Sequence, residues 1–122
     1  MSLQIKTTRV EPDIVVVHLN GRMTSRLGSG IVEPVVTDLL NQNHKKLIFD
    51  LTGVEEIDST GANIIIECFL AVRKAGGGLR LAGASPRTAR LFKITRLDTV
   101  FSCYPTVASA CERFTITAGA SE

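Results

Sequence analysis

Residues 47–78 constrain the fold more than any other stretch, because they join a short apolar run to a longer one through a cluster of helix-capping residues. The short run, residues 47–51, suits a buried strand and is too brief for a helix. The longer run, residues 64–72, favours a helix of about residues 60–75. Basic residues in its last turn and glycines 76–78 beyond it are typical of a helix end. The stretch therefore predicts a strand, a loop, a helix and a turn, in that order.

The cluster Asp58-Ser59-Thr60-Gly61 marks the start of this helix. Ser59 has two interpretations on its residue type alone. It is either a simple N-cap, which stabilises a helix by about 1 kcal/mol, or a hydroxyl that is modified or contacts a partner. Asp58 or Thr60 could cap the helix equally well, so both interpretations stay open at this point.

Apolar periodicity predicts the other elements. The expected strands are residues 3–8, 14–19, 79–82 and 99–102, and the expected helices are residues 31–41, one that opens at Ser85-Pro86 and one that starts at Pro105. Pro34 places the first helix start near Glu33 or kinks that helix. In the third helix Ser85 caps, Pro86 follows, and four residues are expected to face the core: Ala89, Leu91, Phe92 and Ile94. In the C-terminal helix the expected apolar stripe consists of Val107, Ala108, Cys111 and Phe114.

Strands that alternate with helices indicate an α/β fold with a mostly parallel sheet. We expect a single domain over residues 1–116, with a mixed sheet of about five strands, an N-terminal antiparallel hairpin and about four helices. Residues 117–122 are expected to form a flexible tail. The length of 122 residues suits one domain.

Composition excludes several classes of function. A net charge of +2 does not call for nucleic acid, and no run of about 20 apolar residues is present for a membrane span. The N-terminus lacks the apolar region of a signal peptide, so we expect a cytoplasmic protein. The three cysteines match no zinc spacing, and small buried thiols are the simplest expectation for them.

Enzyme motifs are equally poor matches. Ser59 lacks the glycine two positions earlier that a hydrolase nucleophile elbow needs, and His18 and His44 fall in a strand and a polar loop. Glycines 76–78 follow a helix rather than precede one, so they are not a phosphate cradle. We therefore expect no catalytic residue, no cofactor and no metal. The basic residues Arg80, Arg87, Arg90, Lys93 and Arg96 form either a solvated face or a docking site for an acidic partner.

Several segments together resemble the STAS domain of bacterial anti-sigma factor antagonists. The segment DLTGVEEIDSTGANIII (residues 50–66) resembles the family's strand, D-S-[ST]-G turn and apolar helix. VHLNGRM (residues 17–23) resembles its second strand. KAGG, LRL and RLFKITRL (residues 74–77, 79–81 and 90–97) resemble its glycine turn, next strand and third helix. The resemblance spans nearly the whole chain.

The resemblance implies a switchable binding module rather than an enzyme. Ser59 stands where the family is phosphorylated by an anti-sigma factor that is also a serine kinase of the histidine-kinase-like ATPase fold. The unphosphorylated form binds that partner and frees the sigma factor, and phosphorylation blocks binding. Free N–H groups at the helix start are expected to tolerate the phosphate. We expect a monomer or weak dimer that does not bind nucleic acid directly.

The expected partner-binding residues are Asp58, Ser59, Thr60 and Gly61, joined by Arg22, Thr24 and Arg26. Residues 21–24 lie where the family usually carries G-x-L/I-D, so Thr24 replaces an aspartate, and Arg26 belongs to the loop that comes next. We expect Arg22 or Arg26 to lie near Ser59, because both loops leave the same sheet edge. Two alternatives remain: a STAS scaffold that is not phosphorylated, in a stress-signalling or lipid-transport complex, or an α/β module that binds a small ligand or nucleotide.

Overall fold

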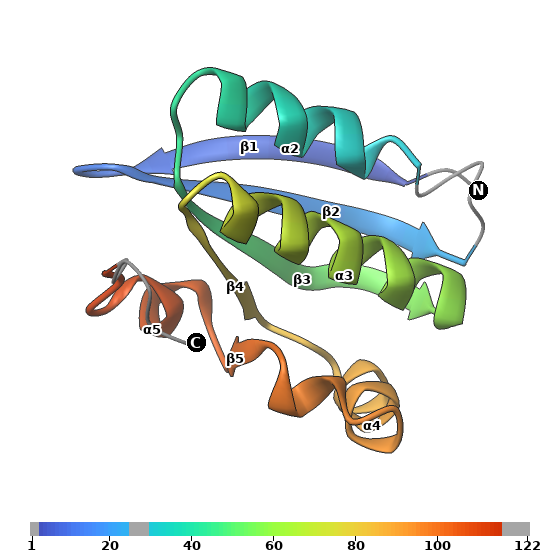
Figure 1. The fold of residues 1–122 in the computed structure, drawn as a ribbon. Coiled ribbons are helices and arrows are strands. Elements are labelled where there is room, and N and C mark those ends of the chain that lie inside the picture. Colours follow the sequence, from blue (N-terminus) through green and yellow to red (C-terminus); the bar gives the residue numbers. More distant parts are fainter. Residues whose placement is uncertain (1–2, 25–29, 116–122) are drawn as a thin grey trace.

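A single sheet with the strand order β1-β2-β3-β4-β5 organises the fold (Figure 1). The computed structural model describes residues 3–24 and 30–115. Its strands are β1 (Gln4–Val10), β2 (Ile14–Met23), β3 (Lys46–Ile57), β4 (Gly78–Ala82) and β5 (Ser102–Tyr104). Its helices are α2 (Val32–Asn41), α3 (Ser59–Lys74), α4 (Pro86–Ile94) and α5 (Val107–Cys111), with a 3-10 turn η1 (Leu97–Thr99). β1 and β2 are antiparallel and the other neighbours are parallel, so the predicted fold class is confirmed.

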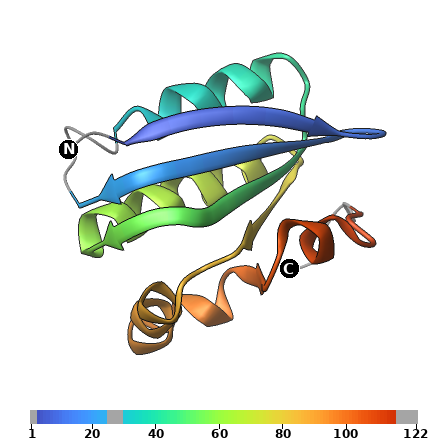
Figure 2. The same ribbon diagram turned by 180° about the vertical axis from the view of Figure 1, so that it is seen from behind.

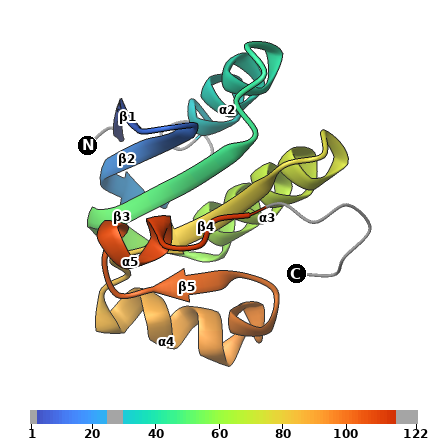
Figure 3. The same ribbon diagram turned by 90° about the vertical axis from the view of Figure 1, so that its left-hand side faces the viewer.

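Strand alternation gives the sheet two covered faces (Figure 3). Val15 and Val17 of β2 point into the main core, which α2, α3 and α4 cover. Ile14 and Val16 point the other way, into a smaller cluster beneath α5. The short α5 covers only part of its face. Most of the buried apolar side chains therefore lie on the α3 side of the sheet. Seven residues of α3 are buried there, so packing holds this helix against the sheet.

The third strand is longer than predicted. We expected residues 47–51 and then a loop, but β3 continues to Ile57. Val54 and Ile57 are buried, and Met23 pairs with Ile57 in the register. Extension lets both apolar side chains reach the core, which a polar loop would not do. Only Asp58 remains between β3 and α3.

The predicted N-terminal half is otherwise accurate. The hairpin and β4 form as expected, and α2 contains Pro34 in its first turn without a break. Proline is tolerated there because the first N–H groups of a helix have no intrahelical acceptor. α3 ends at Lys74, with Ala75 as its C-cap, and Gly76 follows with a φ of 85°, the left-handed conformation that glycine favours.

The predicted boundaries near the C-terminus were wrong. Residues 99–102 are not a strand, because Leu97–Thr99 forms η1 and β5 begins at Ser102. Arg96 adopts a left-handed φ of 63°, which redirects the chain and lets Phe101 reach the core. α5 begins at Val107 rather than Pro105, because Thr106 supplies a capping box. Phe114 is buried as expected, although it follows the helix.

α4 has the predicted N-cap, but the residues that it buries differ from those predicted. Ser85 Oγ accepts a hydrogen bond from Thr88 N at 3.1 Å, and Pro86 follows at the first position. Phe92 is buried, but the predicted inward placement of Ala89 and Ile94 was wrong, since both are exposed. Thr88 takes the inward position because it lies one turn before Phe92. Its hydroxyl is satisfied by Ser85 Oγ at 3.2 Å. Ala108 of α5, also predicted inward, is exposed too.

The predicted tail, residues 117–122, lies outside the described residues. The domain boundary at residue 116 therefore stays a prediction.

Candidate functional site

The ends of β2 and β3 and the start of α3 meet at one edge of the sheet (Figure 2). We call it the Ser59 edge and define it by the described site residues Arg22, Thr24, Asp58, Ser59, Thr60 and Gly61. The register places Arg22 opposite Glu56 and Met23 opposite Ile57, so the end of β2 lies beside the turn into α3. Arg26, which we expected here, lies outside the described residues. The edge is the carboxyl edge of the parallel strands, where ligands of α/β sheets usually gather.

Asp58, and not Ser59, is the N-cap of α3. Its Oδ1 accepts hydrogen bonds from Thr60 N at 2.9 Å and from Gly61 N at 3.2 Å. Ser59 is the first helical residue and is exposed. Within the described residues, no hydrogen bond to its hydroxyl is present. The interpretation of Ser59 as a cap was therefore wrong, and its hydroxyl is presented to solvent.

Gly61 fixes the start of α3 against the end of β2. A Cβ added at Gly61 would lie 2.0 Å from the backbone oxygen of Met23, far inside van der Waals contact. Asp58 N also donates to the Met23 oxygen, at 3.4 Å. Only glycine allows this approach. The position of Ser59 is thus set by backbone packing on β2 rather than by a mobile loop.

The charged residues that directly precede Ser59 in the chain are acidic. Glu55 and Glu56 are exposed just before Asp58, and the Asp58 carboxylate already occupies two helix N–H groups. The expectation of free N–H groups for a phosphate is therefore wrong for Thr60 and Gly61. Arg22 is the neighbouring cation, with its Nε 3.7 Å from Glu56 Oε1 and both side chains half exposed. Such an exposed pair is weak and can exchange partners.

A polar network on the α5 face was not predicted. His18 Nδ1 lies 2.7 Å from Asp50 Oδ2, and His18 Nε2 lies 2.9 Å from the Thr8 hydroxyl. Asp50 Oδ1 also accepts from Thr52 N at 3.0 Å and from Thr52 Oγ1 at 2.6 Å. Burial alone would raise the pKa of Asp50, but the Thr52 and His18 hydrogen bonds outweigh it and lower that pKa. Strand parity in the sequence could have indicated that these side chains share a face.

This network joins neighbouring strands of the sheet. A hydroxyl, an imidazole and a carboxylate lie in the order of a catalytic triad, but acyl transfer also needs N–H donors aimed at an oxyanion. His18 and Asp50 lie on β2 and β3, interior strands whose N–H groups point along the sheet into neighbouring strands. The network links β1, β2 and β3 across the open part of the sheet.

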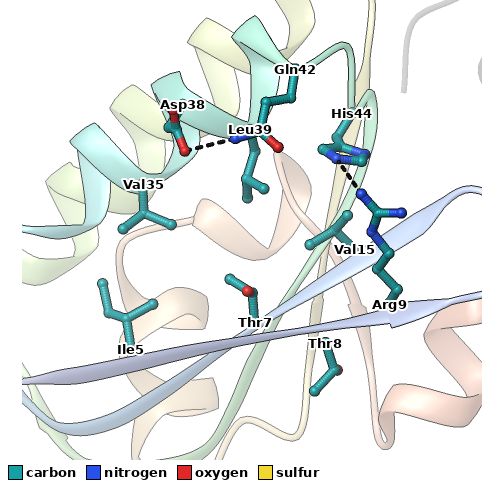
Figure 4. A pocket seen from close by; sticks show the side chains of 10 residues that line it. All are labelled: Ile5, Thr7, Thr8, Arg9, Val15, Val35, Asp38, Leu39, Gln42 and His44. Carbon is teal, nitrogen blue, oxygen red and sulfur yellow. Dashed lines mark hydrogen bonds between the residues drawn. The ribbon is translucent and has the colours of Figure 1, made fainter.

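A groove of about 430 Å³ lies between β1 and α2 (Figure 4). Its floor is apolar, and Arg9, Asp38, Gln42 and His44 stand around it. Arg9 Nη2 lies 3.3 Å from His44 Nε2, and Gln42 donates to Asp38 at 2.8 Å. The groove is lined by the start of β2 and the end of α2, at the opposite edge of the sheet from Ser59. None of the predicted site residues lines it.

The cysteines show no sign of a metal or redox site. Cys68 is buried, whereas Cys103 is exposed and Cys111 is intermediate, so the expectation of three buried thiols was wrong for the last two. Burial, with Glu33 and Glu67, raises the pKa of Cys68 to about 12. Among residues 3–24 and 30–115, no group of three His, Cys, Asp or Glu side chains could hold a metal ion. The helices of the same residues include none that is long and apolar enough to span a bilayer.

The chain matches the STAS domain over residues 6–110 and belongs to that family. A candidate anti-sigma factor antagonist of Thermotoga neapolitana is 27% identical over 104 residues, which cover 85% of this chain and 92% of that protein. The resemblance found in the sequence is thereby confirmed, and the relative carries the name of the anti-sigma factor antagonists.

Solved structures show the same fold. An anti-sigma factor antagonist from Mycobacterium paratuberculosis superposes with a TM-score of 0.81 at 23% identity, covering 93% of this chain and 94% of that one. The Bacillus cell fate determinant SpoIIAA, in its phosphorylated form, superposes with a TM-score of 0.71 at 17% identity, covering 92% and 100% of the two chains. These similarities establish a shared architecture.

Proposed function

We propose that this protein is an anti-sigma factor antagonist that is switched by phosphorylation of Ser59. The observation that carries the proposal is the exposed Ser59 hydroxyl at the rigid start of α3, at the carboxyl edge of the sheet. The unphosphorylated protein binds an anti-sigma factor and releases a sigma factor, and the phosphorylated protein does not bind. It acts in the cytoplasm as a regulatory binding module, without catalysis of its own.

Similarity supports the proposal in two ways. The Thermotoga relative is named for this activity, and SpoIIAA, which shares the fold, has been solved in both unphosphorylated and phosphorylated forms. The proposed partner is an anti-sigma factor that is also a serine kinase of the histidine-kinase-like ATPase fold. It covers the Ser59 edge: Arg22, Thr24, Asp58, Ser59, Thr60 and Gly61, together with Arg26.

The local charges give the switch its mechanism. A phosphate adds about −1.5 to −2 charge and three acceptor oxygens. Because Asp58 already occupies the N–H groups of Thr60 and Gly61, the phosphate is not drawn in to cap α3. It stands instead next to the Asp58 carboxylate, in a segment that also carries Glu55 and Glu56, and faces the partner. A surface that packed against a neutral hydroxyl then meets a hydrated dianion.

Arg22 is the residue placed to respond to this change. Its contact with Glu56 is long and exposed, whereas a phosphate forms shorter, charge-assisted hydrogen bonds with a guanidinium. We propose that Arg22 leaves Glu56 for phosphorylated Ser59. Before phosphorylation Arg22 steers an acidic part of the partner. Replacing Arg22 and Arg26 by alanine is expected to slow association and flatten its salt dependence, with a smaller effect on dissociation.

Two measurements test the switch. Mass spectrometry of the protein from its native cells should find phosphate on Ser59. Titration of the purified anti-sigma factor should show that Ser59→Ala binds like the unmodified parent and that Ser59→Asp binds weakly. Thr60→Ala is the matched control, since it removes a neighbouring hydroxyl that is not the proposed acceptor. Equal affinity of Ser59→Ala and Ser59→Asp would contradict the proposal.

A STAS scaffold that binds without phosphorylation is the second candidate. The carboxylates around Ser59 favour it, because they oppose a further negative charge, and Thr24 replaces the family's usual aspartate. On this alternative the same titration gives equal affinities for both Ser59 variants, and native Ser59 carries no phosphate.

A further inference from the structure

The outward face of α4 carries a cluster of basic side chains around one exposed isoleucine. Arg87, Arg90, Lys93 and Ile94 are all exposed, and their spacing of three or four residues places them on one side of the helix. Thr88 and Phe92 occupy the opposite side and are buried. We call Arg87, Arg90, Lys93, Ile94 and the following Arg96 the basic face.

The charge of this face is segregated from that of the rest of the chain. Residues 86–96 contain four cations and no acidic residue, whereas the whole chain has a net charge of only +2. The remaining residues therefore carry a net charge of −2. Within the described residues, the ion pairs involve His18, Arg22 and Lys46 and no cation of the basic face. These four charges are available to a partner.

Ile94 adds an exposed apolar side chain at the C-terminal end of this row of charges. Its exposed fraction is 69%, the highest of any large hydrophobic side chain in the described part of the chain. A single exposed apolar residue is ordinary on a protein surface. One that lies on the same side of a helix as several cations offers a protein partner an apolar contact next to polar ones.

The backbone conformation of Arg96, one of the four cations, is a further observation. α3 and α4 end with the same turn, in which the residue after the C-cap donates its N–H to an oxygen three residues earlier. In α3 this residue is Gly76 with φ 85°, and in α4 it is Arg96 with φ 63°. Glycine adopts that conformation without strain, whereas other residues are disfavoured in it. An arginine at the glycine position places a cation beside the basic face at some cost in stability.

The basic face is also rigidly placed with respect to Ser59. Phe92 of α4 packs edge-to-face on Phe101 with ring centroids 5.6 Å apart, and Phe101 packs likewise on Phe69 of α3 at 5.5 Å. α4 lies at the same end of the sheet as the start of α3 (Figure 2). A protein that covers Ser59 can therefore reach the basic face.

We propose that the basic face is a second contact surface for the anti-sigma factor and that it binds an acidic patch with an apolar socket for Ile94. The identity of the partner rests on the proposed function. An acidic protein fits better than a membrane, because α4 turns its apolar side into the core and has only Ile94 to insert into lipid. The cations accelerate the encounter, and Ile94 slows dissociation.

The test uses association and dissociation kinetics with the purified cognate anti-sigma factor at several salt concentrations. Arg87→Glu/Arg90→Glu is expected to slow association about tenfold at low salt and to flatten its salt dependence. Ile94→Ala is expected to raise the dissociation rate several-fold. Arg96→Gly should raise the melting temperature and slow association, a combination that a merely solvated arginine does not produce.

Arg113→Gly is the matched control for Arg96→Gly. Arg113 is also an exposed arginine with a left-handed φ, of 52°, but it follows α5 at the opposite end of the sheet. The Arg113→Gly substitution should raise the melting temperature and leave the association rate with the anti-sigma factor unchanged. Vesicles containing phosphatidylglycerol and a 20-base-pair DNA duplex are the comparison probes for an anionic lipid surface and for nucleic acid.

The outcomes separate this inference from the proposed function. If the basic-face variants bind the anti-sigma factor like the parent while Ser59→Asp binds weakly, the inference is overturned and the switch stands. If the basic-face variants lose binding and Ser59→Asp does not, the second surface stands and the switch fails. If the basic-face variants lost binding only to the vesicles or only to the DNA duplex, the assignment to a protein partner would be overturned.

Discussion

α3 and α4 begin at the same edge of the sheet, yet the fold anchors them very differently. α3 has 16 residues, of which seven are buried in the core: Gly61, Ala62, Ile64, Ile65, Cys68, Phe69 and Val72. α4 has 9 residues and buries only Thr88 and Phe92. Acidic residues precede α3 and Gly76 follows its C-cap, whereas every charged residue of α4 is basic and Arg96 follows its C-cap. The helix that presents the hydroxyl is fixed by packing, and the shorter helix is free to carry surface charge.

The largest expected difference between the two helices comes from placing a charge on each. Ile65→Asp in α3 buries an unpaired carboxylate and removes core contacts, since Ile65 has no exposed surface. We expect a loss of about 4 kcal/mol or more, enough to unfold the domain. Ile94→Asp, the matched change in α4, should alter the free energy of unfolding by at most about 0.5 kcal/mol. Urea denaturation measures both, and similar losses would contradict the comparison.

Gly61→Ala tests the packing that holds Ser59 in place. Alanine is intrinsically better than glycine in a helix by about 1 kcal/mol, but its Cβ would meet the Met23 oxygen at 2.0 Å. The clash with backbone outweighs the propensity, and we expect a net loss of about 2 kcal/mol. Gly76→Ala is the control, because nothing lies within 4 Å of its added Cβ and its cost comes from φ alone. A Gly61→Ala variant as stable as the parent would show that α3 does not press on β2.

Replacing the N-caps of α3 and α4 should change the free energy of unfolding by less than the substitutions above. Asp58 accepts two N–H groups of α3, whereas the Ser85 hydroxyl accepts one N–H group of α4. Each replacement by alanine should cost about 1 kcal/mol, with Asp58→Ala the more damaging of the two. Thermal denaturation of both variants checks the order, and a greater loss for Ser85→Ala would reverse our assignment of the firmer helix start.

The smallest effect concerns pH and the polar network of the open sheet face. Because the pKa of Asp50 is lowered in the folded protein, its contribution to stability is present above the unfolded value of about 3.9. The contribution is lost as the pH falls through the lower folded value. Asp50→Asn should therefore be less stable than the parent at pH 7 and approach it under acid conditions. A constant difference from pH 7 to pH 3 would mean that the Asp50 charge plays no part.

Sequence patterns predicted the sheet because apolar alternation and capping residues act locally. They also singled out the cluster from Asp58 to Gly61, where the spacing of capping residues is itself the signal. They could not decide that Asp58 caps α3, because three adjacent side chains were chemically able to do so. That choice depends on where Gly61 packs against Met23, a contact between segments far apart in the chain.

Other features depended on tertiary contacts as well. Ile94 was expected inside by its apolar type, but only one side of α4 meets the core, and Thr88 and Phe92 occupy it. β3 extends beyond its predicted end, residue 51, to Ile57, because its neighbour β2 pairs with it as far as Met23. The pairing of His18 with Asp50 follows from the register of two strands that are 32 residues apart at that point.

The most direct test of the central claim is the affinity of the purified anti-sigma factor for this protein before and after phosphorylation at Ser59. We expect tight binding of the unmodified protein and a loss of at least about a hundredfold in affinity after phosphorylation, since charge mismatch at an interface costs several kcal/mol. The melting temperature should change little, because the phosphate stands on an exposed helix start. Equal affinity of the two forms, with both fully folded, would contradict the account.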